Sequence, residues 1–229
     1  MHVPDGFLDA PTSIGTASLA AAGVAVCLRG ARRELDDRTA PLAGLVAVFV
    51  FAAQMLNFPV GAGTSGHLLG GALAAVLVGP FTATLCLAVV LLVQALAFAD
   101  GGLTALGTNV TLMGIVGVWV GYAVFVAARA ALPKRLASIP VAAALGAALS
   151  VPAAALAFTA LYAIGGTAPI PLRTLAIAMA GWHTLIGLGE AAITYLAVGS
   201  IVATRPDLVH GAGPALATPK LVIRDGALT

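Results

Sequence analysis

The sequence predicts an all-α, polytopic membrane protein with about seven transmembrane helices. Of its 229 residues, 60% are hydrophobic and only 9% are charged, and the mean hydropathy is +1.05. Soluble domains carry about 25% charged residues. Long apolar runs also recur between short polar loops, as expected for helices that cross a hydrocarbon core of about 30 Å. The net charge of +2, with no basic run interleaved with aromatic residues, indicates no nucleic-acid partner.

The apolar runs define the expected helices. They cover about residues 12–28, 41–58, 68–98, 107–128, 139–164 and 172–203. A single helix over 68–98 would be about 46 Å long, well beyond the hydrocarbon core. Gly79-Pro80 interrupts this run, and glycine followed by proline is a strong signal for a break. We therefore expect two short passes that meet at Gly79-Pro80.

The distribution of basic residues predicts the topology. The basic loops 29–38 and 129–135 should both lie in the cytoplasm, so the chain must cross the membrane an even number of times between them. Two passes within 68–98 satisfy this condition and give seven spans in total. The amino terminus is then outside and folded into the bundle, and the carboxy terminus is cytoplasmic. This arrangement fits a multi-pass protein of the cytoplasmic (inner) membrane.

This topology also divides the chain. Residues 1–204 are expected to form one transmembrane domain, which begins with a metal-binding amino-terminal finger of residues 1–10. Residues 205–229 are expected to form a cytoplasmic polar tail. The finger, the loop 61–67 and the segment 100–109 all fall on the outer side, so their polar side chains can meet.

The strongest metal-binding signal is His2 directly after Met1. The Met1 amine, the His2 amide nitrogen once deprotonated, and His2 Nδ1 can hold one ion in a nearly planar chelate. Such nitrogen donors suit Ni(II), Cu(II) or Co(II), and suit Mg(II) or Ca(II) poorly. No basic segment or apolar run precedes Ala10, so we expect no cleavable signal peptide to remove His2. The alternative is a disordered terminus in which His2 is incidental.

A fourth nitrogen is expected from His67, at the end of a Gly-rich loop. Irregular backbone is tolerated at membrane depth only where it lines a cavity, so this loop should place His67 within reach of the finger. The alternative role is a histidine that hydrogen-bonds the backbone. Thr64 and Ser65 in the same loop, and Gln94, are expected to line the cavity or to bond between helices.

Five further polar residues are candidates with two interpretations each. Asn109 could orient a ligand imidazole or cap a helix. Asp5 and Asp100 could attract cations or end helices in turns. His183 faces the same side, although core packing is the simpler role, and Glu190 lies inside the last helix. An intramembrane carboxylate is by default a functional hypothesis, although Glu190 could instead tie two helices together.

Three segments together resemble the CbiM/NikM family, the substrate-specific membrane components of energy-coupling-factor cobalt and nickel transporters. They read MHVPDGFL at 1–8, GAGTSGH at 61–67 and DGGLTALGTN at 100–109. The resemblance extends to about residue 203. Val3 and Phe7 stand where family members often have Ile and Tyr.

The resemblance implies a mode of metal capture and a set of partners. Ni(II) or Co(II) would be the bound substrate, held by the Met1 amine, the His2 amide and imidazole, and His67, with no organic cofactor. Partners would be a transmembrane coupling subunit, cytoplasmic ATPase subunits and often a small auxiliary membrane subunit. The sequence leaves the choice between nickel and cobalt open.

Two other classes are weighed against this interpretation. A self-sufficient secondary metal transporter or channel would favour charged relays and inverted repeats, whereas only Glu190 lies deep in a predicted helix. A membrane-embedded enzyme would need catalytic motifs such as His-Glu-x-x-His or Gly-x-Ser-x-Gly, which the sequence lacks. We therefore expect no enzyme in this chain alone, and ATP hydrolysis in a separate ATPase subunit.

Overall fold

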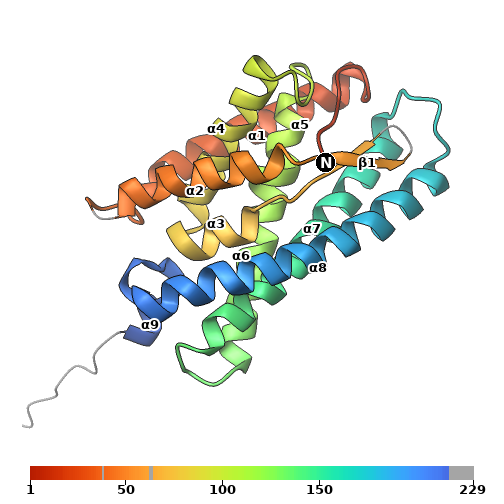
Figure 1. The fold of residues 1–229 in the computed structure, drawn as a ribbon. Helices are drawn as coiled ribbons and strands as arrows, with labels where there is room; N and C mark the ends of the chain where they lie inside the picture. The colour runs from red at the N-terminus through yellow and green to blue at the C-terminus, as the bar shows by residue number, and fades with distance from the viewer. Residues whose placement is uncertain (38, 62–63, 217–229) are drawn as a thin grey trace, which may run out of the picture.

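The computed structural model describes residues 1–37, 39–61 and 64–216, and shows a helical bundle (Figure 1). From the amino terminus its elements are α1 (Ala10–Ala31), α2 (Thr39–Gln54), β1 (Phe58–Gly61), β2 (Thr64–Gly66), α3 (Gly71–Val78), α4 (Pro80–Ala97), α5 (Leu106–Asn109), the π-helical η1 (Val110–Gly117), α6 (Val118–Ala131), α7 (Ser138–Gly165), α8 (Leu172–Thr204), η2 (Pro206–Leu208), η3 (His210–Ala212) and α9 (Gly213–Leu216). The prediction of a helical, multi-pass membrane protein is confirmed.

Five helices of the described chain are long and apolar enough to cross a membrane. They are α1, α4, the continuous helix formed by α5, η1 and α6 (Leu106–Ala131), α7 and α8. The apolar helix α2 is shorter, at 16 residues. These helices match the apolar runs of the sequence in order and nearly in length.

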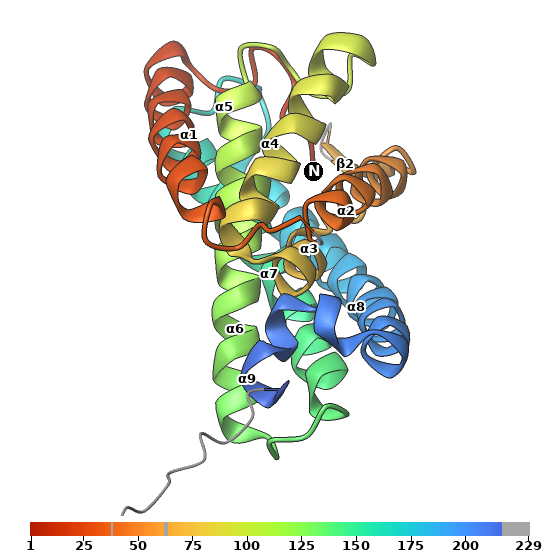
Figure 2. The same ribbon diagram turned by 90° about the vertical axis from the view of Figure 1, so that its left-hand side faces the viewer.

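The break at Gly79 lies where the sequence predicts it. Gly79 has a φ of +89°, a conformation that favours glycine, and Pro80 starts α4. However, α3 has only 8 residues, all of them buried, so at about 1.5 Å per residue it crosses no bilayer alone. Figure 2 shows α3 in the interior, where it packs against α2, α4, α6, α7 and α8. The first pass of the predicted pair is thus an irregular segment followed by a short interior helix.

A residue of the basic loop 29–38, Glu34, stabilises the turn between α3 and α4. The Glu34 carboxylate accepts hydrogen bonds from the amides of Phe81 (3.2 Å) and Thr82 (2.7 Å). These are among the first amides of α4, which have no partner within the helix, and a carboxylate there also complements the helix dipole. The α3–α4 turn therefore lies at the same end of the bundle as the loop 29–38.

Two short strands, Phe58–Gly61 and Thr64–Gly66, pair antiparallel at the loop 61–67, which the sequence did not predict. Strands β1 and β2 pair Phe58 with Gly66 and Pro59 with Ser65. An irregularity between Pro59 and Gly61 shifts the register of the pair. The chain then runs without regular structure through residues 67–70 before α3 begins.

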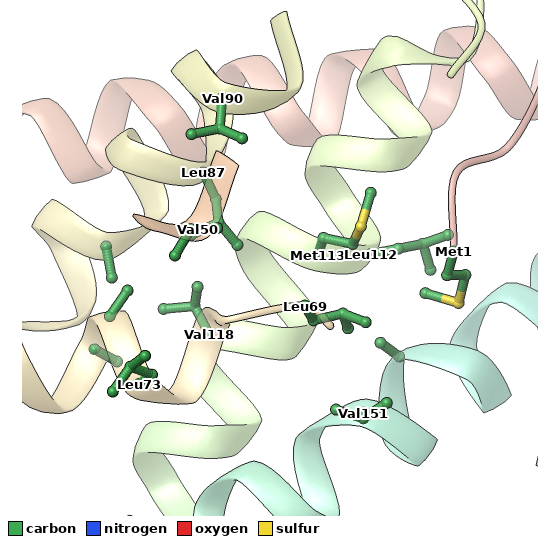
Figure 3. Close-up of a cluster of buried hydrophobic side chains, with 14 of the residues drawn as sticks. Met1, Val50, Leu69, Leu73, Leu87, Val90, Leu112, Met113, Val118 and Val151 are labelled. Atoms are coloured by element: carbon green, nitrogen blue, oxygen red, sulfur yellow. The ribbon is translucent and has the colours of Figure 1, made fainter. Parts of the chain in front are cut away.

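The first residues of the chain lie in the core rather than on the surface. The Met1 side chain is 2% exposed and Val3 is 1% exposed. Figure 3 shows Met1 in one cluster with Leu69, Leu112 and Met113. An apolar anchor at the first residue fixes the amino terminus inside the bundle.

The described part of the expected tail packs against the bundle. Val209 and Ala212 are buried in the core, and Gly211 lies against the ring of Phe125. Residues 217–229 lie outside the described residues, so their assignment to a polar cytoplasmic tail remains a prediction.

Candidate metal-binding site

The finger is fixed by hydrogen bonds to its backbone at Val3. The Val3 amide donates to Asn109 Oδ1 (2.8 Å), and Asn109 Nδ2 donates back to the Val3 carbonyl (3.1 Å). The Gly102 amide donates to the same carbonyl (2.9 Å). Both polar atoms of the Asn109 side chain thus hold the main chain next to His2, which is a third role beside the imidazole contact and the helix cap considered from the sequence.

Asp5 ties the finger to the same loop. Its Oδ1 accepts from the Thr104 amide (2.7 Å) and hydroxyl (2.6 Å), and these hydrogen bonds lower the pKa of the Asp5 carboxyl. At Gly102 any Cβ would collide with the Asp5 backbone, so only glycine allows this approach. Asp5 therefore anchors the finger to the segment 100–109.

The finger continues along the α7–α8 connection. The Asp9 amide donates to the Gly165 carbonyl (2.7 Å), and the Thr167 amide donates to the Phe7 carbonyl (3.1 Å). The Phe7 ring packs against the rings of Phe158 (5.7 Å between centroids) and Tyr162 (5.4 Å). These contacts leave Met1 and His2 as the innermost part of a closed loop.

His2 and His67 meet face to face. Their rings are stacked with centroids 4.5 Å apart and an interplanar angle of 25°, and the two residues are 7% and 0% exposed. The two residues that the sequence assigns to one metal site are thus brought together, in an interior position.

The surroundings of His2 indicate which of its nitrogens is free. Nε2 lies 3.2 Å from Gln94 Oε1. With this oxygen as acceptor, Nε2 carries the hydrogen and Nδ1 has the lone pair, an assignment made from the hydrogen-bond network. Nδ1 lies 3.2 Å from Asp100 Oδ1, yet without hydrogen-bond alignment.

His67 has one nitrogen engaged and one free. Its Nδ1 lies 2.8 Å from the Leu68 carbonyl, an acceptor, so Nδ1 is the donor. This leaves a lone pair on Nε2, which is buried and has no hydrogen-bond partner among the described residues. Burial lowers the pKa of His67 well below its ordinary value, and the positive Met1 amine adds to the effect. The imidazole is therefore favoured in the neutral form that binds metals.

The irregular segment after His67 is clamped from two helices. Glu190 of α8 accepts from the amides of Leu69 (2.7 Å) and Gly70 (3.0 Å), and Gln54 of α2 donates to the Leu69 carbonyl (2.8 Å). All of these groups are buried. Glu190 thus binds backbone next to His67. Gln54 was not anticipated, and its only signal in the sequence is a lone amide near the end of an apolar run.

The Met1 amine completes the cluster. It is buried, and burial lowers its pKa well below the ordinary value, while the nearby Asp100 carboxylate opposes this effect. His183 lies in the same neighbourhood, close enough to act electrostatically on His67. Its Nδ1 lies 2.9 Å from the Met179 carbonyl, and its Nε2 is buried without a partner among the described residues. His183 therefore has the same free nitrogen as His67.

Two further candidates lie in the hairpin. Ser65 belongs to β2, opposite Pro59, and Thr64 begins β2, although its side chain lies outside the described part of the chain. Thr104, which binds Asp5, was missed although it lies inside the segment 100–109 that the sequence singled out. Within the described residues no three His, Cys, Asp or Glu side chains are grouped so that they alone could hold a metal ion.

The fold and the sequence both have well-matched relatives. Residues 2–208 match the family model CbiM, described as the cobalt uptake substrate-specific transmembrane region. The chain is 41% identical over 212 residues to a putative metal transport protein of Haloquadratum walsbyi, covering 91% of this chain and 93% of the relative. It is 41% identical over 213 residues to a putative fused nickel transport protein NikMN of Archaeoglobus fulgidus, covering 92% of this chain and 68% of the relative.

A solved structure shares the fold. The crystal structure of a truncated transition metal transporter superposes with a TM-score of 0.77 at 28% identity, covering 89% of this chain and 99% of that one. The family match over residues 2–208 and this shared architecture show that the chain, a multi-pass membrane protein of metal transport rather than an enzyme, belongs to the CbiM family of cobalt and nickel uptake proteins.

Proposed function

We propose that this chain is the substrate-specific subunit of an energy-coupling-factor transporter and captures Ni(II) or Co(II) with high affinity. The observation that carries the proposal is the stacked pair of His2 and His67. Each ring has one buried nitrogen without a hydrogen-bond partner among the described residues. Buried polar atoms are almost always satisfied, so two orphaned lone pairs beside a buried amine favour a ligand that accepts electron pairs.

Four nitrogens are proposed as donors. They are the Met1 amine, the His2 amide nitrogen, His2 Nδ1 and His67 Nε2. The first three close two fused rings in one plane, and the fourth fills the remaining corner. Loss of the amide proton needs a strongly binding late transition metal, which favours Ni(II) or Co(II) over Mg(II) or Ca(II).

The surrounding side chains favour a cation at this point. The Asp100 carboxylate lies 3.2 Å from His2 Nδ1, and its negative charge would attract a metal ion bound at that nitrogen. Gln94, Asn109 and Glu190 are proposed to orient the donors from outside the plane, as supporting groups commonly do in metal sites.

The proposed partners follow from the family. A transmembrane coupling subunit and cytoplasmic ATPase subunits would supply the energy for uptake, and a small auxiliary membrane subunit would assist. The amino terminus is proposed to face outside and the carboxy terminus the cytoplasm, because the basic loops 29–38 and 129–135 are both expected on the cytoplasmic side.

The free amine gives the most direct test. A chain with one alanine added before Met1 should lose Ni(II) and Co(II) binding in equilibrium titration, because the donor amine becomes an amide and the buried end has no room. A chain with a carboxy-terminal tag is the matched control and should bind like the untagged protein. Full affinity in the extended chain would refute the four-nitrogen site, and comparison of the two metals would rank them.

A further inference from the structure

At the opposite end of the bundle, α6 and η3 enclose a groove of about 550 Å³. Its walls combine the apolar and aromatic side chains of Tyr122, Phe125 and Val126 with cationic or donor groups. The Tyr122 and Phe125 rings are stacked with centroids 5.9 Å apart, and His210 lies against Tyr122 at 6.1 Å. The groove therefore has an apolar floor and a polar rim.

The charged groups of the groove are all of one sign. Arg129 and Lys134 line it, and among the described residues no Asp or Glu does so. The two contacts between a nitrogen and a carboxylate in the described part of the chain lie elsewhere, between His2 and Asp100 and within the 205–207 turn. Arg129 Nη1 donates to the main-chain carbonyls of Pro133 and Arg135 in the loop that follows α6. Two cationic side chains at one groove are thus left without a described carboxylate.

The groove lies where a membrane changes from hydrocarbon to headgroups. The helix Leu106–Ala131 has 26 residues. At about 1.5 Å per residue it is about 39 Å long, about 9 Å more than the hydrocarbon core. Arg129 is in its last turn, so it falls within the headgroup layer. Val126, one turn earlier, is 50% exposed and presents an apolar surface on the hydrocarbon side.

We propose that this groove is a binding site for an anionic phospholipid. The phosphate would be held by Arg129 and Lys134, with Tyr122 and His210 at its side. The part of an acyl chain next to the headgroup would lie on Val126 and on the aromatic floor of the groove. Basic pockets between transmembrane helices at the headgroup level bind anionic lipids in this way, and the match of charge and polarity distinguishes a lipid from a soluble anion. The groove thus provides a lipid contact independent of the metal site.

Two kinds of substitution test the charge and the space separately. Arg129→Gln with Lys134→Gln removes the charges. Gly213→Leu adds an apolar side chain at a residue that lines the groove, where a Cβ meets nothing within 4 Å. The full chain would be titrated with phosphatidylglycerol in native mass spectrometry. We expect binding to weaken by about fivefold for each charge removed, and to be largely lost in Gly213→Leu.

Matched controls lie on the same molecule. Arg32→Gln with Arg33→Gln removes two charges from the other basic loop, and Gly189→Leu adds a side chain on α8 where a Cβ also meets nothing. Both should bind phosphatidylglycerol like the natural protein. Phosphatidylcholine with the same acyl chains and inorganic phosphate should bind weakly to every variant.

Three outcomes would overturn the proposal. The first is equal binding of phosphatidylglycerol and phosphatidylcholine, and the second is an equal loss in the control variants. The third is unchanged lipid binding in the groove variants together with loss of assembly with the coupling subunit, which would assign the groove to a protein partner. Metal titration of the same variants should remain unchanged, so a failure here is distinguishable from a failure of the metal site.

Discussion

Replacement of Asn109 by alanine should weaken metal binding without touching any proposed donor. Asn109 is 1% exposed and makes both hydrogen bonds between its side chain and Val3. Its removal leaves the Val3 amide buried without a partner, while the Val3 carbonyl keeps the Gly102 amide at 2.9 Å. The unsatisfied amide destabilises the docked conformation of the finger, in which His2 lies against His67.

The size of the effect follows from this single orphaned amide. An unsatisfied buried donor costs about 1–3 kcal/mol, which corresponds to roughly 5- to 150-fold in an equilibrium constant. The upper value applies when the undocked finger is already the major form without metal. We expect Asn109→Ala to raise the Kd for Ni(II) or Co(II) by at least about fivefold.

Thr104→Ala is the matched control, because it removes the hydrogen bond from the Thr104 hydroxyl to Asp5 at an exposed place on the same finger, while the backbone amide of residue 104 still donates to Asp5. Water replaces the lost hydrogen bond, so the Kd should change by less than about threefold. Equilibrium metal titration gives the Kd values, and hydrogen exchange at the Val3 amide reports docking directly. Affinity of Asn109→Ala within twofold of the natural protein, with fast exchange at Val3, would show that finger docking and metal capture are uncoupled.

Other substitutions and pH should separate donors from supporting groups. His67→Ala should lose most of the metal affinity in equilibrium titration and His183→Ala little; the reverse result would transfer the fourth-donor role to His183. Glu190→Gln should raise the Kd by about tenfold, because a neutral amide holds the backbone of segment 67–70 less well than a carboxylate; an unchanged Kd would leave Glu190 a purely structural residue. Release of the His2 amide proton on binding should make the affinity fall with falling pH by about one proton per metal ion. Burial lowers the pKa of the Met1 amine and of His67, which favours their neutral donor forms, so these two groups should not steepen that dependence until the pH drops through their lowered values. A dependence steeper than about one proton above about pH 6.5, the ordinary imidazole value, would contradict this.

The membrane helices and their break were predictable because hydropathy and chain chemistry are local. The apolar runs located the long helices to within a few residues at each end, and Gly79-Pro80 marked a turn that needs a positive φ. The two histidines were placed together by one topological argument, since loop charge set both on one side.

The supporting contacts could not be predicted because they join residues far apart in sequence. Gln54 binds the Leu69 carbonyl and Glu190 binds the Leu69 and Gly70 amides from different helices, and nothing local in either helix indicates that target. Asn109 illustrates the same limit, since its position suggested a cap or an imidazole contact and only the folded finger supplies the Val3 backbone. The short length of α3 likewise depends on the irregular segment before it, which these distant groups stabilise.

The closed loop from the finger to the α7–α8 connection has a consequence for the time course of synthesis. Phe7 packs on Phe158 and Tyr162, and Leu8 bridges to Gly166, so the first residues need a surface made about 150 residues later. At about 5–20 residues per second, the amino end waits roughly 8–30 s before that surface exists. A chain that ends before α7 therefore lacks the surface on which its finger closes. A docked amino terminus thus indicates that the chain has been synthesised at least as far as the α7–α8 connection.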